Sequence, residues 1–210
     1  MKKRSFVLML VPVMLLLIMT GATFSLSPTA HAAALDDPNP SGTPDNLRVP
    51  DNEVLVWDGV TEGLVRDMPD GAQVYECLPS GDGYAWTFIG PKAHLVNPNR
   101  PEDGIYHGPV SFGPNPVPQW VNLADGSSVQ GSVIQRAPGQ PGAIAMLLLQ
   151  SVGNSNAADG TPGLLGNVNY IQRLDTSGGV APSDTCDADN NGQDVYVPYS
   201  AHYYLYAPAQ

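Results

Sequence analysis

The segment from Asp187 to Gly192 carries the densest run of oxygen ligands in the sequence. Its residues, DADNNG, match the first half of a calcium-binding loop, in which oxygens at alternate positions converge on the ion. The candidate ligands are Asp187, Asp189, Asn191 and Asp194. The twelfth position of such a loop is Pro198 here, where a bidentate glutamate is usual. Asp and Asn are also favoured in exposed turns, so a polar turn without calcium is the competing interpretation. No other cofactor is indicated.

Three histidines could act as acid, base or metal ligand, because imidazole titrates near neutral pH and binds metals. They are His94, His107 and His202, and all fall on or beside expected strands. No H-x-H or H-E-x-x-H spacing pairs them, so a shared metal site would depend on the fold. His107 is the first candidate because it stands where a strand meets a Gly-Pro turn, and strand ends often carry function.

Aromatic side chains gather near the end of the chain, where five tyrosines fall between Tyr196 and Tyr206. Rings with polar tips can stack on sugars or line an apolar pocket. Ordinary sheet packing explains the same enrichment, since tyrosine favours strands. Arg173 is a rare cation in an expected strand, and we expect a carboxylate or carbonyl groups to meet it. The candidate ligand-binding residues are His107, His94, Trp86, Tyr75, Tyr204 and Arg173.

Motifs for nucleophilic or phosphate chemistry are missing from the sequence. It contains no G-x-S-x-G elbow and no glycine-rich loop placed between a strand and a helix. Its 20 acidic residues offer too many pairs to identify a glycosidase site. The sequence therefore favours a noncatalytic binding or surface-associated domain for a small molecule or glycan. The alternative is a secreted enzyme, metal-dependent and using His107 and His94; no catalytic residue is assigned.

Short apolar runs separated by Gly, Pro, Asn and Asp predict a single all-β domain over residues 53–210. We expect roughly eight to ten mostly antiparallel strands in a sandwich or small barrel with long Gly/Pro-rich loops. The run AIAMLLLQSV at 143–152 suits either a helix or a strand buried on both faces, and a strand is favoured. The expected strands are 54–57, 73–78, 84–89, 93–96, 104–107, 129–135, 168–174 and 203–206.

The N-terminal region has the pattern of an exported protein. Residues 1–32 combine a basic start, an apolar run and a small-residue cleavage site, which predicts a secretion signal. The run is also long enough to serve as an uncleaved anchor. Residues 33–52 are rich in proline and small polar residues and are expected to form a flexible linker. We therefore expect a secreted, extracellular protein without a membrane span once the signal is cleaved.

The charge of the chain excludes two classes of binding partner. All 20 acidic residues follow residue 33, while three of the nine Lys and Arg belong to the signal. This acidic protein has no basic cluster, which excludes binding to nucleic acid or anionic lipid through phosphates.

Cys77 and Cys186 most simply form one disulfide in an exported chain, closing a loop of about 110 residues. Metal ligation by the two cysteines is the weaker alternative, since no CxxC spacing or nearby His supports it.

Several segments, taken in order, resemble the secreted bacterial and fungal family known as domain of unknown function 3455. They are QVYEC at 73–77, WTFIGPKAHL at 86–95, HGP at 107–109, GSSVQG at 126–131, AMLLL at 145–149, YIQRLDTSGGVAP at 170–182 and VPYSAHYYLY at 197–206. The resemblance implies an exported, mostly β domain with its two cysteines placed as here, and it implies no reaction or ligand. His202 stands where an acidic residue is expected, and Phe112 where a tryptophan is usual.

Overall fold

The computed structural model describes residues 37–61, 64–65, 68–69 and 71–210, of which residues 37–210 belong to one compact unit. The expected secretion signal, residues 1–32, lies outside the described residues. Among the described residues, no helix is longer than a three-residue 3-10 turn, and none is long and apolar enough to cross a membrane. The expectation of an all-β protein is confirmed.

The main sheet contains nine antiparallel strands. They are β1 (Glu53–Thr61), β4 (Gly71–Ser80), β5 (Gly83–Asn97), β6 (Arg100–Pro109), β7 (Pro118–Asn122), β8 (Ser128–Ala137), β9 (Met146–Ser155), β10 (Tyr170–Gly178) and β11 (Asp194–Pro208). A separate pair is formed by β2 (Leu64–Val65) and β3 (Met68–Pro69), and the 3-10 turns are η1 (Asp45–Leu47) and η2 (Ala188–Asn190). The expected strands 84–89 and 93–96 are parts of the single strand β5, and β7 was not expected.

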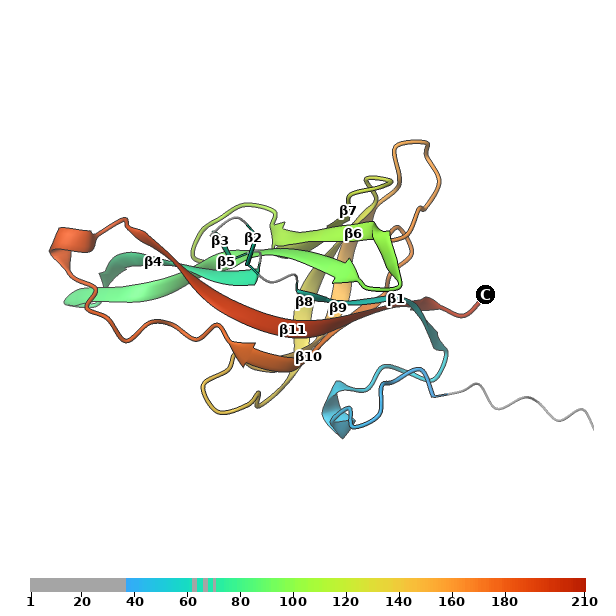
Figure 1. Cartoon of the computed structure of the whole chain (residues 1–210), viewed down its shortest axis with the longest axis horizontal. Coiled ribbons are helices and arrows are strands. Elements are labelled where there is room, and N and C mark those ends of the chain that lie inside the picture. Colours follow the sequence, from blue (N-terminus) through green and yellow to red (C-terminus); the bar gives the residue numbers. More distant parts are fainter. Residues whose placement is uncertain (1–36, 62–63, 66–67, 70) are drawn as a thin grey trace, which may run out of the picture. The chain divides into compact units, whose positions relative to one another are not determined.

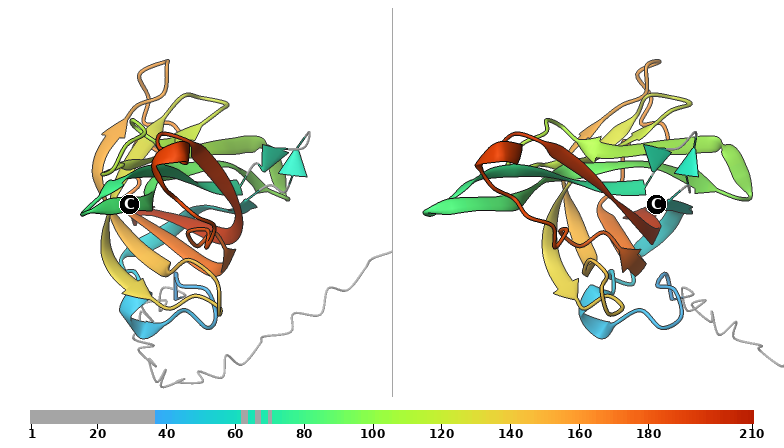
Figure 2. Two further views of the ribbon diagram at one scale, coloured as in Figure 1. Left: turned by 90° about the vertical axis from the view of Figure 1, so that its left-hand side faces the viewer. Right: turned by 60° about the vertical axis from the view of Figure 1, so that its left-hand side comes forward.

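The main sheet closes on itself because β5 and β11, each 15 residues long, pair with two strands in turn. Toward one end β1 lies between them, with Val60 opposite both Val96 and His202. Toward the other end β4 takes that place, with Gln73 opposite both Pro91 and Val197. Figure 1 shows the long red β11 passing from β4 to β1, and Figure 2 shows the sheet curving round from yellow β8 to red β11. The sheet is therefore a small barrel and not a sandwich.

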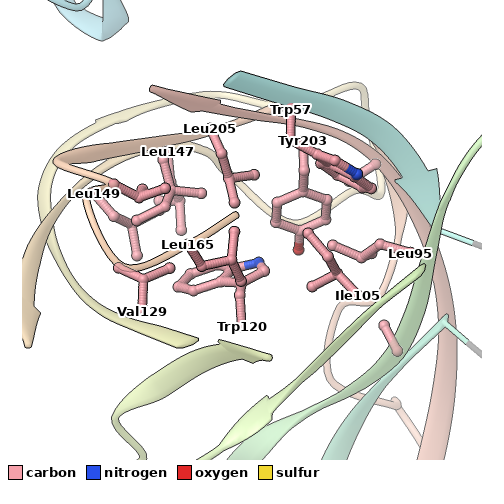
Figure 3. Close-up of a cluster of buried hydrophobic side chains, with 14 of the residues drawn as sticks. Trp57, Leu95, Ile105, Trp120, Val129, Leu147, Leu149, Leu165, Tyr203 and Leu205 are labelled. Carbon is pink, nitrogen blue, oxygen red and sulfur yellow. The ribbon is translucent and has the colours of Figure 1, made fainter. Parts of the chain in front are cut away.

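Alternating side chains divide each strand between the inside and the outside of the barrel. Figure 3 shows the inner cluster, in which Trp57, Trp120 and Tyr203 meet aliphatic side chains from several strands. Leu147 and Leu149 belong to this inner cluster, whereas the intervening residue of β9 belongs to a second cluster outside the barrel. The expected strand at 143–152 begins only at Met146, and its three leucines, 147–149, are consecutive because this part of β9 is buried on both faces.

One end of the barrel is closed by the connection between β9 and β10, residues 156–169. Leu165 and Val168 of this connection are buried in the inner cluster. Its backbone is held by side chains of neighbouring elements: the Leu165 amide donates to Ser127 Oγ (3.0 Å), and Asn154 Nδ2 donates to the carbonyls of Leu165 (2.9 Å) and Val168 (3.0 Å). This connection therefore fills one end of the barrel interior with buried side chains.

Residues 37–52, which the sequence assigns to a flexible linker, pack against the outside of the barrel instead. Leu47 and Val49 are buried there with Leu148, Leu174 and Tyr206. The segment is too polar to fold by itself, but the outer face of β9, β10 and β11 supplies the apolar surface that it lacks. The composition of residues 37–52 does not by itself indicate that the outer face of the sheet is their packing partner.

A buried glutamine ties this N-terminal segment to the sheet. The Gln172 amide nitrogen donates to Asn39 Oδ1 (2.9 Å) and to the Leu47 carbonyl (2.7 Å), and its oxygen accepts from the Tyr206 hydroxyl (2.6 Å). Gln172 is fully buried, so these bonds satisfy a group that would otherwise be costly to bury.

Cys77 and Cys186 form a disulfide with an S–S distance of 2.04 Å. The bond joins β4 to the connection between β10 and β11. It closes a covalent loop of 109 residues that contains most of the barrel.

Removing the disulfide should lower thermal stability, because the unfolded chain regains the freedom that the closed loop denies it. On the chain-entropy model, Cys77→Ser should cost about 4 to 5 kcal/mol, less any strain relieved. Calorimetry of the variant and of the reduced protein tests this. An intact mass showing two free thiols in the native protein would contradict the bond.

Shortening Leu47 should destabilise the barrel if residues 37–52 are part of the folded unit. Leu47 is 0% exposed, so Leu47→Ala should cost about 2 to 5 kcal/mol in urea unfolding. Leu55→Ala, at a residue of β1 that is 44% exposed, is the matched control and should cost less than about 1 kcal/mol. Equal losses in the two variants would mean that the segment contributes nothing to stability.

Candidate functional site

A cavity of about 520 Å³ lies toward the end of the barrel opposite residues 156–169. Side chains of eight strands, β4 to β11, form its wall, and the connections 110–117 and 138–145 contribute to its rim. Much of the lining is apolar, from Phe88, Val133, Leu147, Leu149 and several prolines. This volume falls within the range of sites that bind small molecules.

Arg173 is the inward-facing cation of this cavity. It lies on β10 between Leu147 of β9 and Tyr203 of β11, so all three belong to one row of inner residues. Its Nε and Nη2 donate to the Ala145 carbonyl at 3.2 and 2.9 Å. No ion pair links Arg173 to a carboxylate in the described parts of the chain. A carbonyl, one of the two expected partners, therefore holds the guanidinium, and its charge is not neutralised there.

His107 lies on β6, across the barrel from β10, and is only 2% exposed. Its Nδ1 lies 3.0 Å from the Gln119 carbonyl, which can only accept, so Nδ1 carries the proton and Nε2 the lone pair. The ring stacks on Trp120, with centroids 4.3 Å apart. Burial, with a smaller contribution from the Arg173 charge, lowers the pKa of His107 to about 3. The imidazole is therefore neutral at neutral pH.

Two further residues of the cavity wall have buried N–H groups without an acceptor. Gln73 Nε2 and Trp120 Nε1 find no hydrogen-bond partner in the part of the chain that the structure describes. The nearby phenols are occupied: the Tyr75 hydroxyl donates to the Gly179 carbonyl (2.8 Å), and the hydroxyls of Tyr199 and Tyr203 lie 3.0 Å apart. The wall thus offers hydrogen-bond donors and, among its described residues, no carboxylate.

Three of the six predicted ligand-binding residues, His107, Tyr75 and Arg173, line this cavity together. His94 does not join them. Its neighbour Ala93 pairs directly with His107 and shares its inward face, so His94 points to the opposite face of the sheet, beside Gly104. A metal site shared by His107 and His94 is therefore not formed.

Trp86 and Tyr204 also lie away from the cavity. Trp86 pairs with Cys77 and donates from Nε1 to the Asp184 carbonyl (2.9 Å), which places it beside the disulfide. Tyr204 faces the outside of the barrel, where its ring stacks on His202 with centroids 4.3 Å apart. Both aromatic side chains serve local packing in this structure.

The predicted calcium ligands form a hydrogen-bonded turn. Asp187 caps η2: its carboxylate accepts from the Asp189 amide (3.0 Å), while the Asn190 side chain accepts from the Asp187 amide (2.7 Å). Asp194 begins β11 opposite Glu76. Within the described ranges, no three His, Cys, Asp or Glu side chains are grouped to hold a metal ion. The four candidates, Asp187, Asp189, Asn191 and Asp194, are not brought together.

The cavity is also lined by Gln73, Trp120, Tyr203 and Arg136, which were not predicted from the sequence. Gln73 could have been found, because it lies two residues before Tyr75 on the same strand and so shares its face. The position of Trp120 could not have been predicted, because its strand β7 was not expected.

Lowering the pH should destabilise the protein partly through His107. Its pKa is about 3 in the folded protein and 6.5 ordinarily, so between these values the unfolded chain binds more protons and stability falls as pH falls. The loss should approach about 1.4 kcal/mol per pH unit within this window. Urea unfolding from pH 7 to 4 should show a shallower decline for His107→Gln than for the wild type. Parallel profiles would contradict the assignment.

Comparison with known proteins gives one match. The family described as "Protein of unknown function (DUF3455)" matches residues 63–207, which confirms the resemblance seen in the sequence. No curated protein and no solved structure matches the chain. The matched region contains seven strands of the main sheet in full and β11 as far as Ala207, and these eight strands form the cavity wall. The chain therefore belongs to the DUF3455 family of proteins of unknown function.

Proposed function

We propose that this protein is a secreted, noncatalytic binding protein that holds a small molecule in the cavity of its barrel. The observation that carries the proposal is the cavity of about 520 Å³, which combines an apolar lining with a few convergent polar groups. Small-molecule sites generally have this composition. A barrel of about eight strands has an interior wide enough for one small ligand.

The protonation states of the cavity residues support binding over catalysis. General acids and bases work best when their pKa lies near the working pH. Burial lowers the pKa of His107 to about 3 and raises the pKa of Tyr75 and Tyr203 above their usual value of 10.0. These three groups therefore keep a fixed protonation state near neutral pH.

The composition of the lining favours a small molecule over a glycan. Sugars need many hydrogen-bonding partners and exposed aromatic platforms. Here leucine, valine and proline side chains form much of the wall, and the wall residues Tyr75, Trp120 and Tyr203 are at most 8% exposed, so they offer no exposed platform. An apolar body with one polar end suits this wall better.

Secretion is part of the proposal. Disulfides persist mainly in oxidising compartments, and the bond between Cys77 and Cys186 is of the structural kind found in exported proteins. The signal pattern at residues 1–32 supplies the route of export.

Filling the cavity should abolish binding of an apolar probe. N-phenylnaphthylamine, which fluoresces when it leaves water, should bind the wild type and bind Val133→Phe at least about tenfold more weakly, because the larger ring takes up cavity volume. Val152→Phe is the matched control, since Val152 is 61% exposed and lies outside the cavity. Fluorescence titration measures all three proteins. Equal binding by Val133→Phe, or none by the wild type, would overturn the proposal.

A further inference from the structure

We propose that the ligand is an amphipathic organic anion, with a carboxylate or phosphate head group that Arg173 and Gln73 bind and an apolar body that the rest of the cavity holds. This inference rests on the proposed function and specifies the ligand class. It depends on the distribution of charge, on unused hydrogen-bond donors and on the lining.

The charge of the cavity wall is opposite to that of the protein. The chain has 20 Asp and Glu against nine Lys and Arg, for a formal net charge of -11. Yet Arg136 and Arg173 both line the cavity, and none of its described lining residues is acidic. The overall field repels anions, so an anion would be held by short contacts in a poorly solvated site, where charge interactions are strongest.

Arg173 is the stronger anchor of the two. Its guanidinium is half-buried and is held by the uncharged Ala145 carbonyl through Nε and Nη2. A guanidinium has five N–H donors in a planar fork that matches two oxygens of one anion. Its charge also contributes to the low pKa of His107, after the larger effect of burial, and so extends across the interior. Arg136 is exposed at the rim and more screened by solvent.

Gln73 provides the second observation. It is only 3% exposed, and its Nε2 donors have no acceptor among the described residues. A buried amide without a partner is destabilising, so this position favours a ligand that supplies acceptor oxygens. Trp120 Nε1 adds another unpaired donor on the wall. A head group with two or three oxygens and no hydrogens satisfies several donors at once, which an alcohol or amine cannot do.

The remaining surface fits an apolar body. Leu147, Leu149 and Val133 line the cavity, and Leu147 lies directly beside Arg173 in the sheet. The connection between β6 and β7 brings Pro114 and Pro116 to the rim. An apolar body bound in the cavity would therefore contact apolar side chains next to the guanidinium.

A pair of fluorescent probes that differ by one anionic group tests this inference. Anilinonaphthalene sulfonate is an anionic derivative of the uncharged N-phenylnaphthylamine, and both emit more strongly in apolar sites. The wild type should bind the sulfonate at least about tenfold more tightly, as expected for charge-assisted hydrogen bonds. Displacement of the sulfonate by naphthoate and by naphthyl phosphate, each compared with naphthalenemethanol, then distinguishes a carboxylate ligand from a phosphate ligand.

Variants connect the preference to Arg173. Arg173→Met should remove the preference for the sulfonate and leave binding of the uncharged probe within about threefold. Arg173→Lys, which keeps the charge, should retain part of the preference for the sulfonate. Arg100→Met is the matched control, because Arg100 pairs with Asp103 (3.4 Å) and does not line the cavity. The wild-type comparison is informative even if Arg173→Met does not fold.

The outcomes separate this inference from the proposed function. If both probes bind the wild type with equal affinity, the cavity binds small molecules but the preference for anions is wrong. If the preference is present and survives in Arg173→Met, the assigned anchor is wrong. If neither probe binds, the proposed function fails and this inference with it.

Discussion

The double pairing of β5 and β11 closes the sheet, and the other features of the molecule follow from that closure. Each strand exchanges one neighbour for another along its length, β4 toward one end and β1 toward the other. A closed sheet has no unpaired edge and encloses the inward side chain of every strand. The space inside is then filled by side chains, by residues 156–169 at one end, and incompletely at the other.

The two faces of the barrel are stabilised in different ways. Inside, apolar packing dominates, and at the cavity Arg173 donates to the Ala145 carbonyl while the Gln73 amide nitrogen has no partner among the described residues. Outside, the N-terminal segment covers β9 to β11, and both the amide nitrogen and the oxygen of the equally buried Gln172 have hydrogen-bond partners. The contrast matters because buried polar groups are normally satisfied. Unsatisfied donors on the wall of a cavity can be satisfied by a bound ligand that supplies the acceptors.

Prediction from the sequence succeeded where local pattern decides the structure. The alternation of Tyr84, Trp86 and Phe88 marked β5, and a run of three leucines marked a strand buried on both faces. Prediction failed where the structure of a segment depends on strands or surfaces that lie elsewhere in the chain. The strand β7 is only five residues long, begins at Pro118 and follows Pro114 and Pro116, and it forms because β6 and β8 pair with it on either side. The prediction of a flexible linker over residues 33–52 failed at residues 37–52 because their apolar partner, the outer face of the sheet, comes from distant parts of the chain.

The strand content, the family, the cysteine pair and the scarcity of cations could be predicted from residue types and local pattern. Which of the chemically capable residues lie close together depends on the folded arrangement of the strands. Register placed His107 inside the barrel and His94 outside it, although both lie on adjacent strands. Closure brought Gln73, Tyr75 and Arg173 to one cavity from strands far apart in the chain. Side-chain direction in a strand alternates with each residue, so a shared site depends on long-range pairing that no local pattern encodes.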